Sequence, residues 1–518
     1  MRQGGMSDLE VMLGKARRLE DQGRHTAALE AYQAAFLASG QDPAVAADIG
    51  RLALRMGEYA IAEQLLRLFL ASEPDSVDGC IGLAHALREL QRYGEALDVL
   101  TPAVHANPGE ARLWSALGAV LVQQGRSDQA MPFLDEAVRL DPRSGVALYA
   151  RANGLADLGE HDRAIADYEG AMARLPKADR ERVRLPLALS RLGVGDLAGG
   201  WDDYRARFSP HSVKPVTFEM DAAPWPFDPG EPADALSGRS LILVGEQGLG
   251  DEVMFANVAA DVLQVVGKDG RLVLAVEARL APLFARSFPQ AEVVAHETRA
   301  GEGGVVVRSA PAKADYWAPM GGPLRRFRRS AADFPRGACL KPEPARVAHW
   351  RGVLAARPGP AVGLLWKSLK LQGERQRHFA PFVLWAPVLA TPGVTFVNLQ
   401  YGDCAAELAH ARQALGVDIF QPPGIDLKQD LDDVAALCCA LDLTVGPSNA
   451  TLNLAGATGA PLWLIAPQDA WTMLGTQAYP WYPQARCFTT VAAEGWTATM
   501  HAVAGALGAF AASAPPKA

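Results

Sequence analysis

The 518-residue chain is long enough for two or three domains, and an apolar fraction of 49% can fill their cores. Its 58 Asp and Glu against 50 Lys and Arg give a net charge of −8, which argues against nucleic acid or an anionic membrane as the main partner. The six cysteines show no CxxC spacing, and residues 1–10 contain no apolar signal-peptide core. The chain also contains no run of ~20 apolar residues. These features predict a cytoplasmic protein without a membrane span.

The first part of the chain repeats itself with a fixed period of 34 residues. One alanine marks the phase, at Ala28, Ala62, Ala96, Ala130 and Ala164. A period of this length is typical of stacked tetratricopeptide helix pairs, and an ordinary helical bundle would not keep one phase for so long. Residues 9–208 are therefore predicted to form an all-α repeat domain that binds a protein partner.

Other positions of the repeat recur in the same phase. Glycine precedes the alanine by five residues in four copies, where the first helix turns into the second, and Gln91 takes its place in the remaining copy. Proline ends each second helix, at Pro74, Pro108, Pro142 and Pro176. A sixth, degenerate copy is expected to end near Phe208. The repeat domain is accordingly assigned to residues 1–208.

A stretch rich in Pro, Gly and Asp follows, and residues 209–238 are predicted to be an interdomain linker. Short apolar runs then alternate with helical windows, which is the pattern of a parallel sheet covered by helices. The first series of strands is expected at 240–244, 272–276 and 291–294. The second series is expected at 361–366, 394–399, 443–445 and 461–465.

Two Rossmann-like α/β domains, 239–358 and 359–518, are therefore predicted, the second ending in a helix. Open parallel sheets bind ligands at the carboxyl ends of their strands, so a cleft between the two domains would be the site. This arrangement is similar to the GT-B fold of glycosyltransferases.

The first candidate motif lies between the first strand of this region and a helix. Residues 245–252 are Gly-Glu-Gln-Gly-Leu-Gly-Asp-Glu, with Gly248 and Gly250 allowing a ligand to approach the backbone and Asp251 at the helix start. The spacing is not that of a dinucleotide fingerprint. Asp251 and Glu252 could equally be favourable first-turn charges at the positive end of the helix.

The Gly-Leu-Gly-Asp string resembles the Gly-Asp motif of lipopolysaccharide heptosyltransferases, and this resemblance implies that Asp251 is the general base. Together with Trp201, Tyr204 and the Arg207-Phe208 pair, it also resembles bacterial proteins that join tetratricopeptide repeats to such a transferase, flagellin glycosyltransferases among them. The layout is similar to that of O-GlcNAc transferases as well. The resemblance implies a nucleotide-sugar donor and no bound metal or other cofactor.

The second candidate motif follows the strand at 443–445 and opens a helix, where unpaired N–H groups could hold a donor phosphate. The predicted donor-binding residues here are Ser448, Asn449, Thr451 and Asn453. A simple helix cap by Ser448 or Asn449 is the alternative. The corresponding heptosyltransferase stretch, Asp-Thr-Gly-x-x-His, maps onto Ser448, Asn449, Ala450 and Asn453 and differs from this chain at all four positions, which argues against a heptose donor.

The third candidate group lies past the first strand of the second sheet. The resemblance places a functional lysine near Lys367, and Arg375 and Arg377 are predicted to stabilise the leaving phosphate, although they could be solvated surface charges. His378 is a minor candidate, and Gln400 could contact the donor. The acidic residues at 430–433 are interpreted as helix-start charges rather than as a metal site.

The resulting hypothesis is an inverting protein O-glycosyltransferase. A nonulosonic acid such as pseudaminic acid, carried on CMP, is the first donor to test, and a UDP-sugar is the alternative. Flagellin is the acceptor that the resemblance implies, held by the repeats. Two further hypotheses stay open: a heptosyltransferase-like enzyme acting on a lipid or oligosaccharide, and a catalytically inert scaffold.

Overall fold

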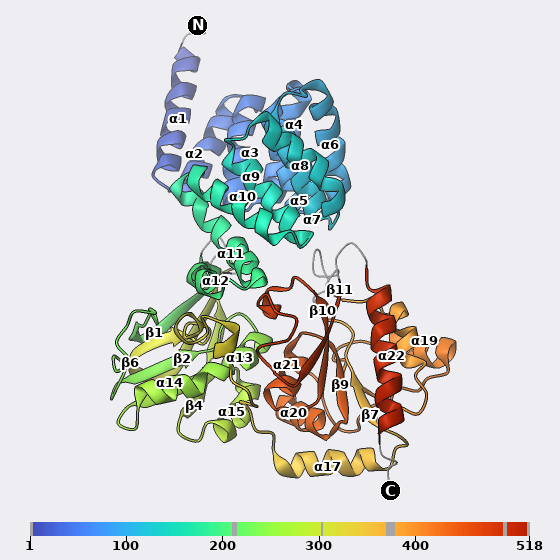
Figure 1. The fold of residues 1–518 in the computed structure, drawn as a ribbon. Helices are drawn as coiled ribbons and strands as arrows, with labels where there is room; N and C mark the ends of the chain where they lie inside the picture. The colour runs from blue at the N-terminus through green and yellow to red at the C-terminus, as the bar shows by residue number, and fades with distance from the viewer. Residues whose placement is uncertain (1–3, 210–214, 302–303, 369–378, 491–494, 515–518) are drawn as a thin grey trace. The chain divides into compact units, whose positions relative to one another are not determined.

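A computed structural model describes residues 4–209, 215–301, 304–368, 379–490 and 495–514 (Figure 1). The chain forms two compact units, Met1–Leu175 and Pro176–Ala518. The first consists of helices, and the second contains two parallel sheets with helices packed against them. The predicted combination of a helical repeat region and an α/β region with two sheets is confirmed at this level.

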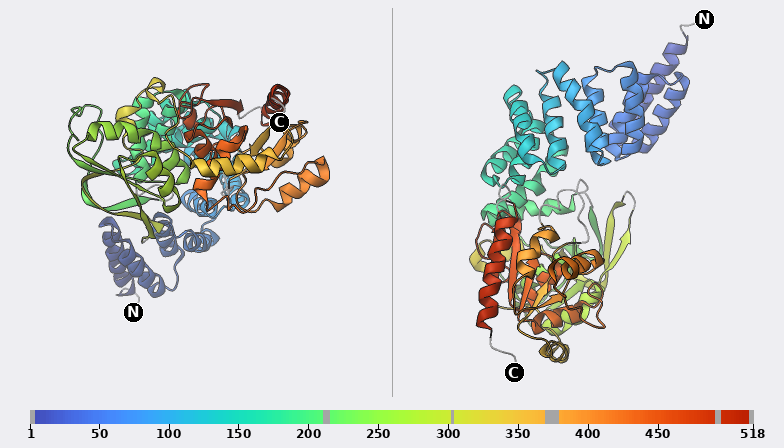
Figure 2. Two further views of the ribbon diagram at one scale, coloured as in Figure 1. Left: turned by 90° about the horizontal axis from the view of Figure 1, so that it is seen from below. Right: turned by 90° about the vertical axis from the view of Figure 1, so that its right-hand side faces the viewer.

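The first unit is a row of antiparallel helix pairs, as Figures 1 and 2 show. The repeated alanines are fully buried between the helices of each pair. The helices are α1 (Gly4–Asp21), α2 (His25–Ala38), α3 (Pro43–Met56), α4 (Tyr59–Ser72), α5 (Val77–Glu89), α6 (Tyr93–Ala106), α7 (Ala111–Gln123), α8 (Ser127–Leu140), α9 (Gly145–Asp157) and α10 (His161–Arg174).

The turn inside each pair needs a left-handed backbone, which explains the repeated glycine. Gly57 has a φ of 78° and ends α3, and Gly125 and Gly159 each have a φ of 79°. Gln91 adopts the same conformation with a φ of 60°. A side chain with a Cβ atom is strained in this region, so Gln91 keeps the geometry at a local cost of ~1 kcal/mol.

The predicted sixth repeat belongs to the second unit. Helices α11 (Lys177–Val194) and α12 (Leu197–Tyr204) and the 3₁₀ turn η1 (Arg205–Phe208) bury their apolar side chains in the core of the α/β region. Trp201 packs edge-on against Trp471 and Trp481, and its indole N–H donates to the carbonyl of Arg328 at 2.8 Å. The division of the chain therefore falls after Leu175, whereas the sequence analysis placed it after residue 208.

The first sheet has the strand order β1-β6-β2-β3-β4, all parallel, with β5 antiparallel to β6. Its strands are β1 (Val216–Pro224), β2 (Ser240–Val244), β3 (Arg271–Val276), β4 (Glu292–Ala295), β5 (Glu297–Ala300) and β6 (Val306–Pro319). The predicted linker thus contains β1, which pairs with β6 along its whole length. Val216, Phe218 and Met220 alternate with polar residues there, a period-2 pattern that the surrounding prolines conceal.

Helices cover one face of this sheet. Side chains of α13 (Leu249–Phe255), α14 (Ala259–Val266) and α15 (Ala281–Ser287) pack on Leu241, Leu243 and Leu274. The alternate residues Ile242, Val244 and Val273 cluster with side chains of β1, β4 and β6, and no described helix takes part in that cluster. This differs from the expected pattern of a parallel sheet with helices on both faces.

The second sheet has the order β11-β10-β9-β7-β8, all parallel. One face packs on α20 and α21, and the other packs on α18, α19 and the C-terminal helix α22, the deep red helix in Figures 1 and 2. The strands are β7 (Ala361–Leu364), β8 (Thr395–Asn398), β9 (Leu443–Pro447), β10 (Leu462–Pro467) and β11 (Ala485–Thr490). The remaining α-helices of the second unit, in chain order, are α16 (Leu324–Phe327), α17 (Pro344–Ala355), α18 (Ala386–Leu389), α19 (Ala405–Leu415), α20 (Leu431–Ala440), α21 (Ala450–Ala457) and α22 (Thr497–Ser513).

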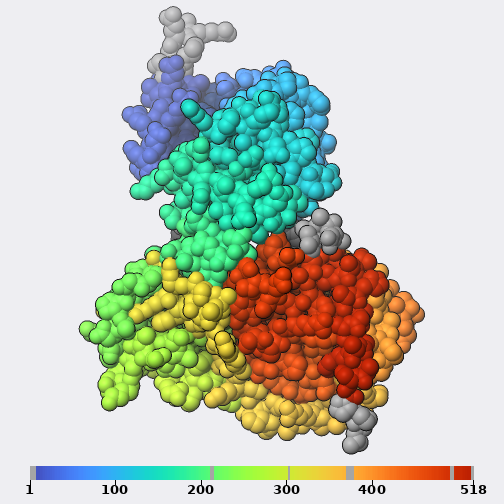
Figure 3. Space-filling view, in the orientation of Figure 1, coloured from blue at the N-terminus to red at the C-terminus, as the bar shows by residue number. Residues whose placement is uncertain are grey.

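In each sheet the strand order switches from one side to the other at a strand that is followed by a candidate motif. In the first sheet β3 and β4 lie on one side of β2, and β6 lies on the other. In the second, β8 lies on one side of β7 and β9 lies on the other. Ligands of open α/β sheets bind at the carboxyl ends of the strands at such switch points. The segments around the two sheets pack directly against each other in the space-filling view (Figure 3).

Candidate active site

The segment after β2 contains two glycines, Gly245 and Gly250, at which a side chain would crowd a neighbouring residue. A Cβ atom on Gly245 would lie 2.3 Å from the carboxyl carbon of Glu252. A Cβ atom on Gly250 would lie 3.3 Å from Nδ2 of Asn453 and 3.4 Å from the backbone nitrogen of Ala450. The first turn of α13 therefore lies directly against the first turn of α21, at the carboxyl ends of β2 and β9.

Asp251 lies on the first turn of α13, and its side chain is partly buried. Burial raises the pKa of the Asp251 carboxyl to about 7. The neighbouring Glu246 carboxylate raises it further, whereas the Arg207 guanidinium acts in the opposite direction. A carboxyl group with this pKa exchanges its proton near neutral pH, which is the property that a general base requires.

The loop that carries Asp251 is fixed by a buried ion pair that the sequence analysis did not assign. Arg207 is 4% exposed and Glu246 is fully buried. The guanidinium of Arg207 donates two hydrogen bonds to the Glu246 carboxylate, and the backbone N–H of Gly321 donates a third. The hydroxyl of Tyr204 donates to Gln247 at 2.9 Å. The segment at 204–208 thus holds residues 246 and 247 directly before α13.

A second buried carboxylate, that of Glu252, belongs to the first turn of α13. Glu252 is 1% exposed and contacts Nε2 of His296 at 3.0 Å and a guanidinium nitrogen of Arg308 at 3.4 Å. It also accepts the backbone N–H of Glu277 at 2.8 Å. Arg308 donates to the carbonyl of Glu246 at 2.7 Å. Glu252, for which the sequence analysis left a helper or capping role open, is therefore part of the structural support for the loop.

The start of α21 is built from neutral polar groups. Asn449 is the N-cap, and its side-chain oxygen accepts the backbone N–H of Leu452 at 3.1 Å. Ser448 lies 3.0 Å from the hydroxyl of Tyr479, and Thr451 is buried. The capping alternative is thus realised by Asn449. Helix N–H groups before Leu452 have no intrahelical acceptor, which is the usual basis of a phosphate site.

Asn453 joins the two helix starts. Its Nδ2 donates to the carbonyl of Gly250 at 3.0 Å, across 203 positions of sequence. Its Oδ1 is buried without a hydrogen-bond partner among the described residues. Tyr479 adds a second link, because its hydroxyl contacts both Ser448 and the sulfur of Met254 on α13. The predicted base and the predicted phosphate residues of α21 therefore lie at one place in the second unit.

Lys367 and Gln400 lie at the carboxyl ends of β7 and β8. The ammonium group of Lys367 forms an ion pair with Glu407 of α19. Gln400 is 1% exposed, and its amide bonds the backbone of Trp366, Lys367 and Tyr401. These contacts favour a role for Gln400 in positioning the loop that carries Lys367. Its contact with a donor stays a prediction.

The loop expected to supply cations is not described. Arg375, Arg377 and the minor candidate His378 lie outside the described residues, so their predicted roles stay predictions. Among the described residues, no group of three or more His, Cys, Asp and Glu side chains is arranged to hold a metal ion. Asp432 lies in the first turn of α20 and forms an ion pair with Arg286. No described helix is long and apolar enough to cross a membrane.

Sequence reasoning missed the roles of Glu246, His296 and Arg308. Arg207 was part of the family string, but nothing in its local sequence pointed to a carboxylate 39 residues away. Glu246 lies inside the glycine motif, where one further carboxylate beside Asp251 gives no signal by itself. The three-dimensional pairing of buried charges is the property that distinguishes these residues.

Comparison with known proteins supports the repeat assignment. A model described as Tetratricopeptide repeat matches residues 13–77 and 81–145. Protein FlbA of Caulobacter vibrioides is 49% identical over 503 residues, which cover 95% of this chain and 83% of that protein. Cellulose synthase operon protein C of Pseudomonas fluorescens is 34% identical over 31% of this chain and 14% of its own length.

A thermophilic TPR protein from Thermus thermophilus is similar to part of the chain. It shares 27% identity over 36% of this chain and 99% of its own, with a TM-score of 0.32. The similarity to Protein FlbA, in contrast, includes both the repeats and the α/β region. The chain therefore belongs to the FlbA family.

Proposed function

We propose that the protein is an inverting O-glycosyltransferase that transfers a sugar from a nucleotide donor to a protein acceptor. The observation that carries this proposal is the position of Asp251. Its carboxyl group, with a pKa of about 7, lies where the start of α13 meets the start of α21. A base beside a site suited to phosphate is what sugar transfer from a nucleotide requires.

In the proposed reaction the Asp251 carboxylate removes the proton from a Ser or Thr hydroxyl of the acceptor. The hydroxyl oxygen forms a bond to the anomeric carbon from the face opposite the phosphate. The bond between that carbon and the phosphate oxygen breaks, and the nucleotide leaves with the electron pair. The configuration at the anomeric carbon is inverted, and no oxidant or reductant is needed.

Residues of the second sheet would stabilise the leaving phosphate. The N–H groups at the start of α21 and the hydroxyls of Ser448 and Thr451 can donate to it. Lys367 would change partners, from Glu407 to the phosphate, when the donor binds. Arg375 and Arg377 are proposed to assist, and Gln400 would hold the Lys367 loop in place.

The donor and acceptor are proposed from the resemblance described above. A CMP-linked nonulosonic acid is the first donor to test, with UDP-sugars as the alternative class. Flagellin, bound by the repeats, is the proposed acceptor, because repeat surfaces suit an extended protein segment. A heptosyltransferase-like reaction on a lipid or oligosaccharide is the competing enzymatic proposal.

A specific observation favours an inert scaffold as the second candidate function. Ser448, Asn449 and Asn453 replace motif residues of heptosyltransferases, and Nδ2 of Asn453 donates to the carbonyl of Gly250 rather than to a ligand. A scaffold would keep the repeats as a binding surface without a sugar-transfer step. Ligand binding separates this proposal from the enzymatic one.

The decisive experiment is the intact mass of flagellin from cells that carry the native protein or its Asp251→Asn form. Loss of mass in whole sugar units with Asp251→Asn, but not with the exposed control Asp269→Asn, would support both acceptor and base. Unchanged flagellin would contradict the acceptor, and altered lipopolysaccharide would then favour the heptosyltransferase-like alternative. A nucleotide sugar at ~100 times its Kd should stabilise an enzyme by ~2.7 kcal/mol, and the absence of such stabilisation with every donor would favour the scaffold.

A further inference from the structure

The repeats permit a comparison between equivalent gaps, because residues 34 positions apart occupy the same place in successive helix pairs. The gap between α4 and α6 is filled by charges. Arg92 contacts Glu63 at 2.7 Å and Glu95 at 2.6 Å. Arg67 contacts the same two carboxylates at 3.0 and 2.8 Å. Two cations and two anions thus neutralise each other in this gap.

One period later, between α6 and α8, the arginine is kept and its carboxylates are lost. Arg126 corresponds to Arg92, whereas Leu97 and Gln129 replace Glu63 and Glu95. Thr101 replaces Arg67. Nε of Arg126 donates to the amide oxygen of Gln129 at 2.9 Å, and Nη1 donates to the amide oxygen of Gln124 at 3.0 Å. Both acceptors are neutral, so the charge of Arg126 is hydrogen-bonded without being neutralised.

Three nearby arginines of the first unit are neutralised, in contrast to Arg126. Arg112 pairs with Asp78 and Glu110, Arg139 with Glu136, and Arg151 with Asp167. Each of these guanidinium groups forms an ion pair with a carboxylate. Among the described residues, no carboxylate forms an ion pair with Arg126. A carboxylate supplied from outside would therefore form a charge-assisted hydrogen bond that the chain itself does not supply at this position.

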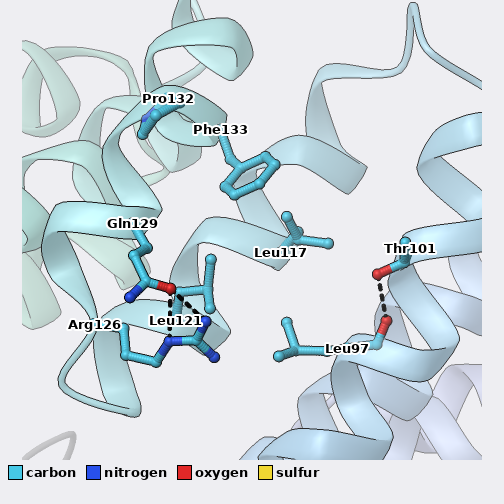
Figure 4. Close-up of a pocket in the computed structure, with 8 residues that line it drawn as sticks. All are labelled: Leu97, Thr101, Leu117, Leu121, Arg126, Gln129, Pro132 and Phe133. Carbon is cyan, nitrogen blue, oxygen red and sulfur yellow. Dashed lines mark hydrogen bonds between the residues drawn. The ribbon is translucent and has the colours of Figure 1, made fainter.

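A pocket of about 420 Å³ lies in this second gap and is drawn in Figure 4. Leu117 and Leu121 of α7 are its buried base, and the side chains of Leu97 and Thr101 line the side formed by α6. Pro132 and Phe133 of α8 line the opposite side, with Arg126 and Gln129 at one end. A volume of several hundred Å³ with apolar lining and a few polar groups at one end is typical of a binding site.

We infer that this pocket is a docking subsite for a polypeptide segment that presents a carboxylate next to a large apolar side chain. The apolar side chain enters between Leu97 and Phe133, and the carboxylate binds Arg126. Relative to the preceding gap, this gap lacks two carboxylates and one arginine, so it carries one net positive charge that is complementary to this occupant. The subsite rests on the proposed function in one respect, namely that the repeats bind a protein acceptor.

The test measures binding by the full chain and requires no sugar transfer. The probe is a fluorescein-labelled peptide, Ser-Glu-Leu-Phe-Glu-Ser, followed by fluorescence anisotropy, with Ser-Gln-Leu-Phe-Gln-Ser as its neutral counterpart. The acidic peptide is expected to bind up to ~5-fold more tightly than the neutral one, as for a partly exposed charge pair. This preference should weaken as salt is raised, because the pair is screened.

Two variants locate the binding. Arg126→Gln removes the cation, and the double variant Leu97→Glu with Gln129→Glu restores the carboxylates of the preceding gap, which pair with Arg126 and leave one excess negative charge. Both are expected to abolish the preference for the acidic peptide. Arg139→Gln removes an arginine of α8 that does not line the pocket and should leave the preference unchanged. Circular dichroism and thermal unfolding establish that each variant is folded.

Three outcomes would overturn the proposal. They are equal binding of the two peptides, no binding of either, and a preference that survives in both pocket variants. If the double variant changes the sedimentation behaviour of the chain while neither peptide binds, the occupant is a second copy and the proposal is wrong. If the peptide does not bind, the proposed sugar transfer is not contradicted. If Asp251→Asn still transfers sugar, the proposed peptide subsite is not contradicted. The failure of the subsite and the failure of the proposed function can therefore be distinguished.

Discussion

The two helix starts that meet in the second unit are built from opposite kinds of side chains. The start of α13 rests on buried charges, with Arg207 on Glu246 below the loop and His296 and Arg308 on Glu252 behind it. The start of α21 rests on neutral groups, with Asn449 as cap and a hydroxyl pair formed by Ser448 and Tyr479.

This difference is consistent with the two proposed tasks of the site. Buried carboxylates raise the pKa of a neighbouring acid, so the charged start suits proton transfer by Asp251. A neutral helix start keeps its positive dipole end available, so it suits an anionic ligand. The comparison leads to four predictions, beginning with the largest expected effect.

Replacement of Asp251 by Asn should lower the rate of sugar transfer by ~10²–10⁴-fold, because the side chain can no longer accept a proton. Stability should not fall, since the change removes a carboxyl group that is costly to ionise at this place. Transfer rates and unfolding curves of the same preparation check both statements. By contrast, Ser448→Ala at the neutral start should mainly weaken donor binding. An equal decrease in the rate constant of transfer in the two variants would contradict the proposal that the two helix starts have different tasks.

Replacement of Glu246 by Gln should lower the free energy of unfolding of the second unit by about 3–5 kcal/mol, because Arg207 keeps its charge and loses its buried partner. Denaturant unfolding measures the loss. Combination with Arg207→Met should recover a large part of it, since no unpaired charge is then buried. Glu407→Gln, which breaks the partly exposed pair with Lys367, serves as the control and should cost less than ~1 kcal/mol.

The raised pKa of Asp251 predicts two pH effects with defined signs. Transfer requires the ionised carboxylate, so the rate should rise with pH to a plateau, with a midpoint near pH 7. The folded state holds this proton more tightly than the unfolded state, so the contribution of Asp251 to stability is greatest below about pH 4 and is lost as pH rises to about 7. Unfolding measured across this range for the native protein and Asp251→Asn should show a smaller decline in the variant. Identical pH profiles would contradict the shifted pKa.

Replacement of Asn453 by Ala should lower the free energy of unfolding by ~1 kcal/mol, because the carbonyl of Gly250 loses its donor. The same measurement on Asn449→Ala should give a loss of similar size for a different reason, the loss of the helix cap. Only Asn453→Ala should also loosen the contact between α13 and α21, which hydrogen exchange of the α13 amides can detect. Unchanged exchange in Asn453→Ala would show that this contact does not hold the two helix starts together.

Four of the strands that sequence analysis found differ in a definite way from two of the strands that it missed. Strands β2, β3, β7 and β9 are continuous apolar runs because both of their faces are buried, and such runs stand out in the sequence. Strands β1 and β6 carry exposed charged residues and prolines, and they were not recognised. These two strands pair with each other, although they are far apart in the sequence, and a local sequence pattern does not predict such a pairing.

The sequence by itself determined the repeats, since a 34-residue period requires only local contacts between a buried alanine, a left-handed turn and the next helix. It also determined that Asp251 and Asn449 start helices after strands, because glycine and capping signals are local. Only the tertiary structure decided that α11 and α12 join the α/β core and that Glu246 finds Arg207. It likewise decided that Gly250 meets Asn453 across 203 residues. These contacts depend on which buried charges and backbone groups satisfy one another after folding, and that choice is made in three dimensions.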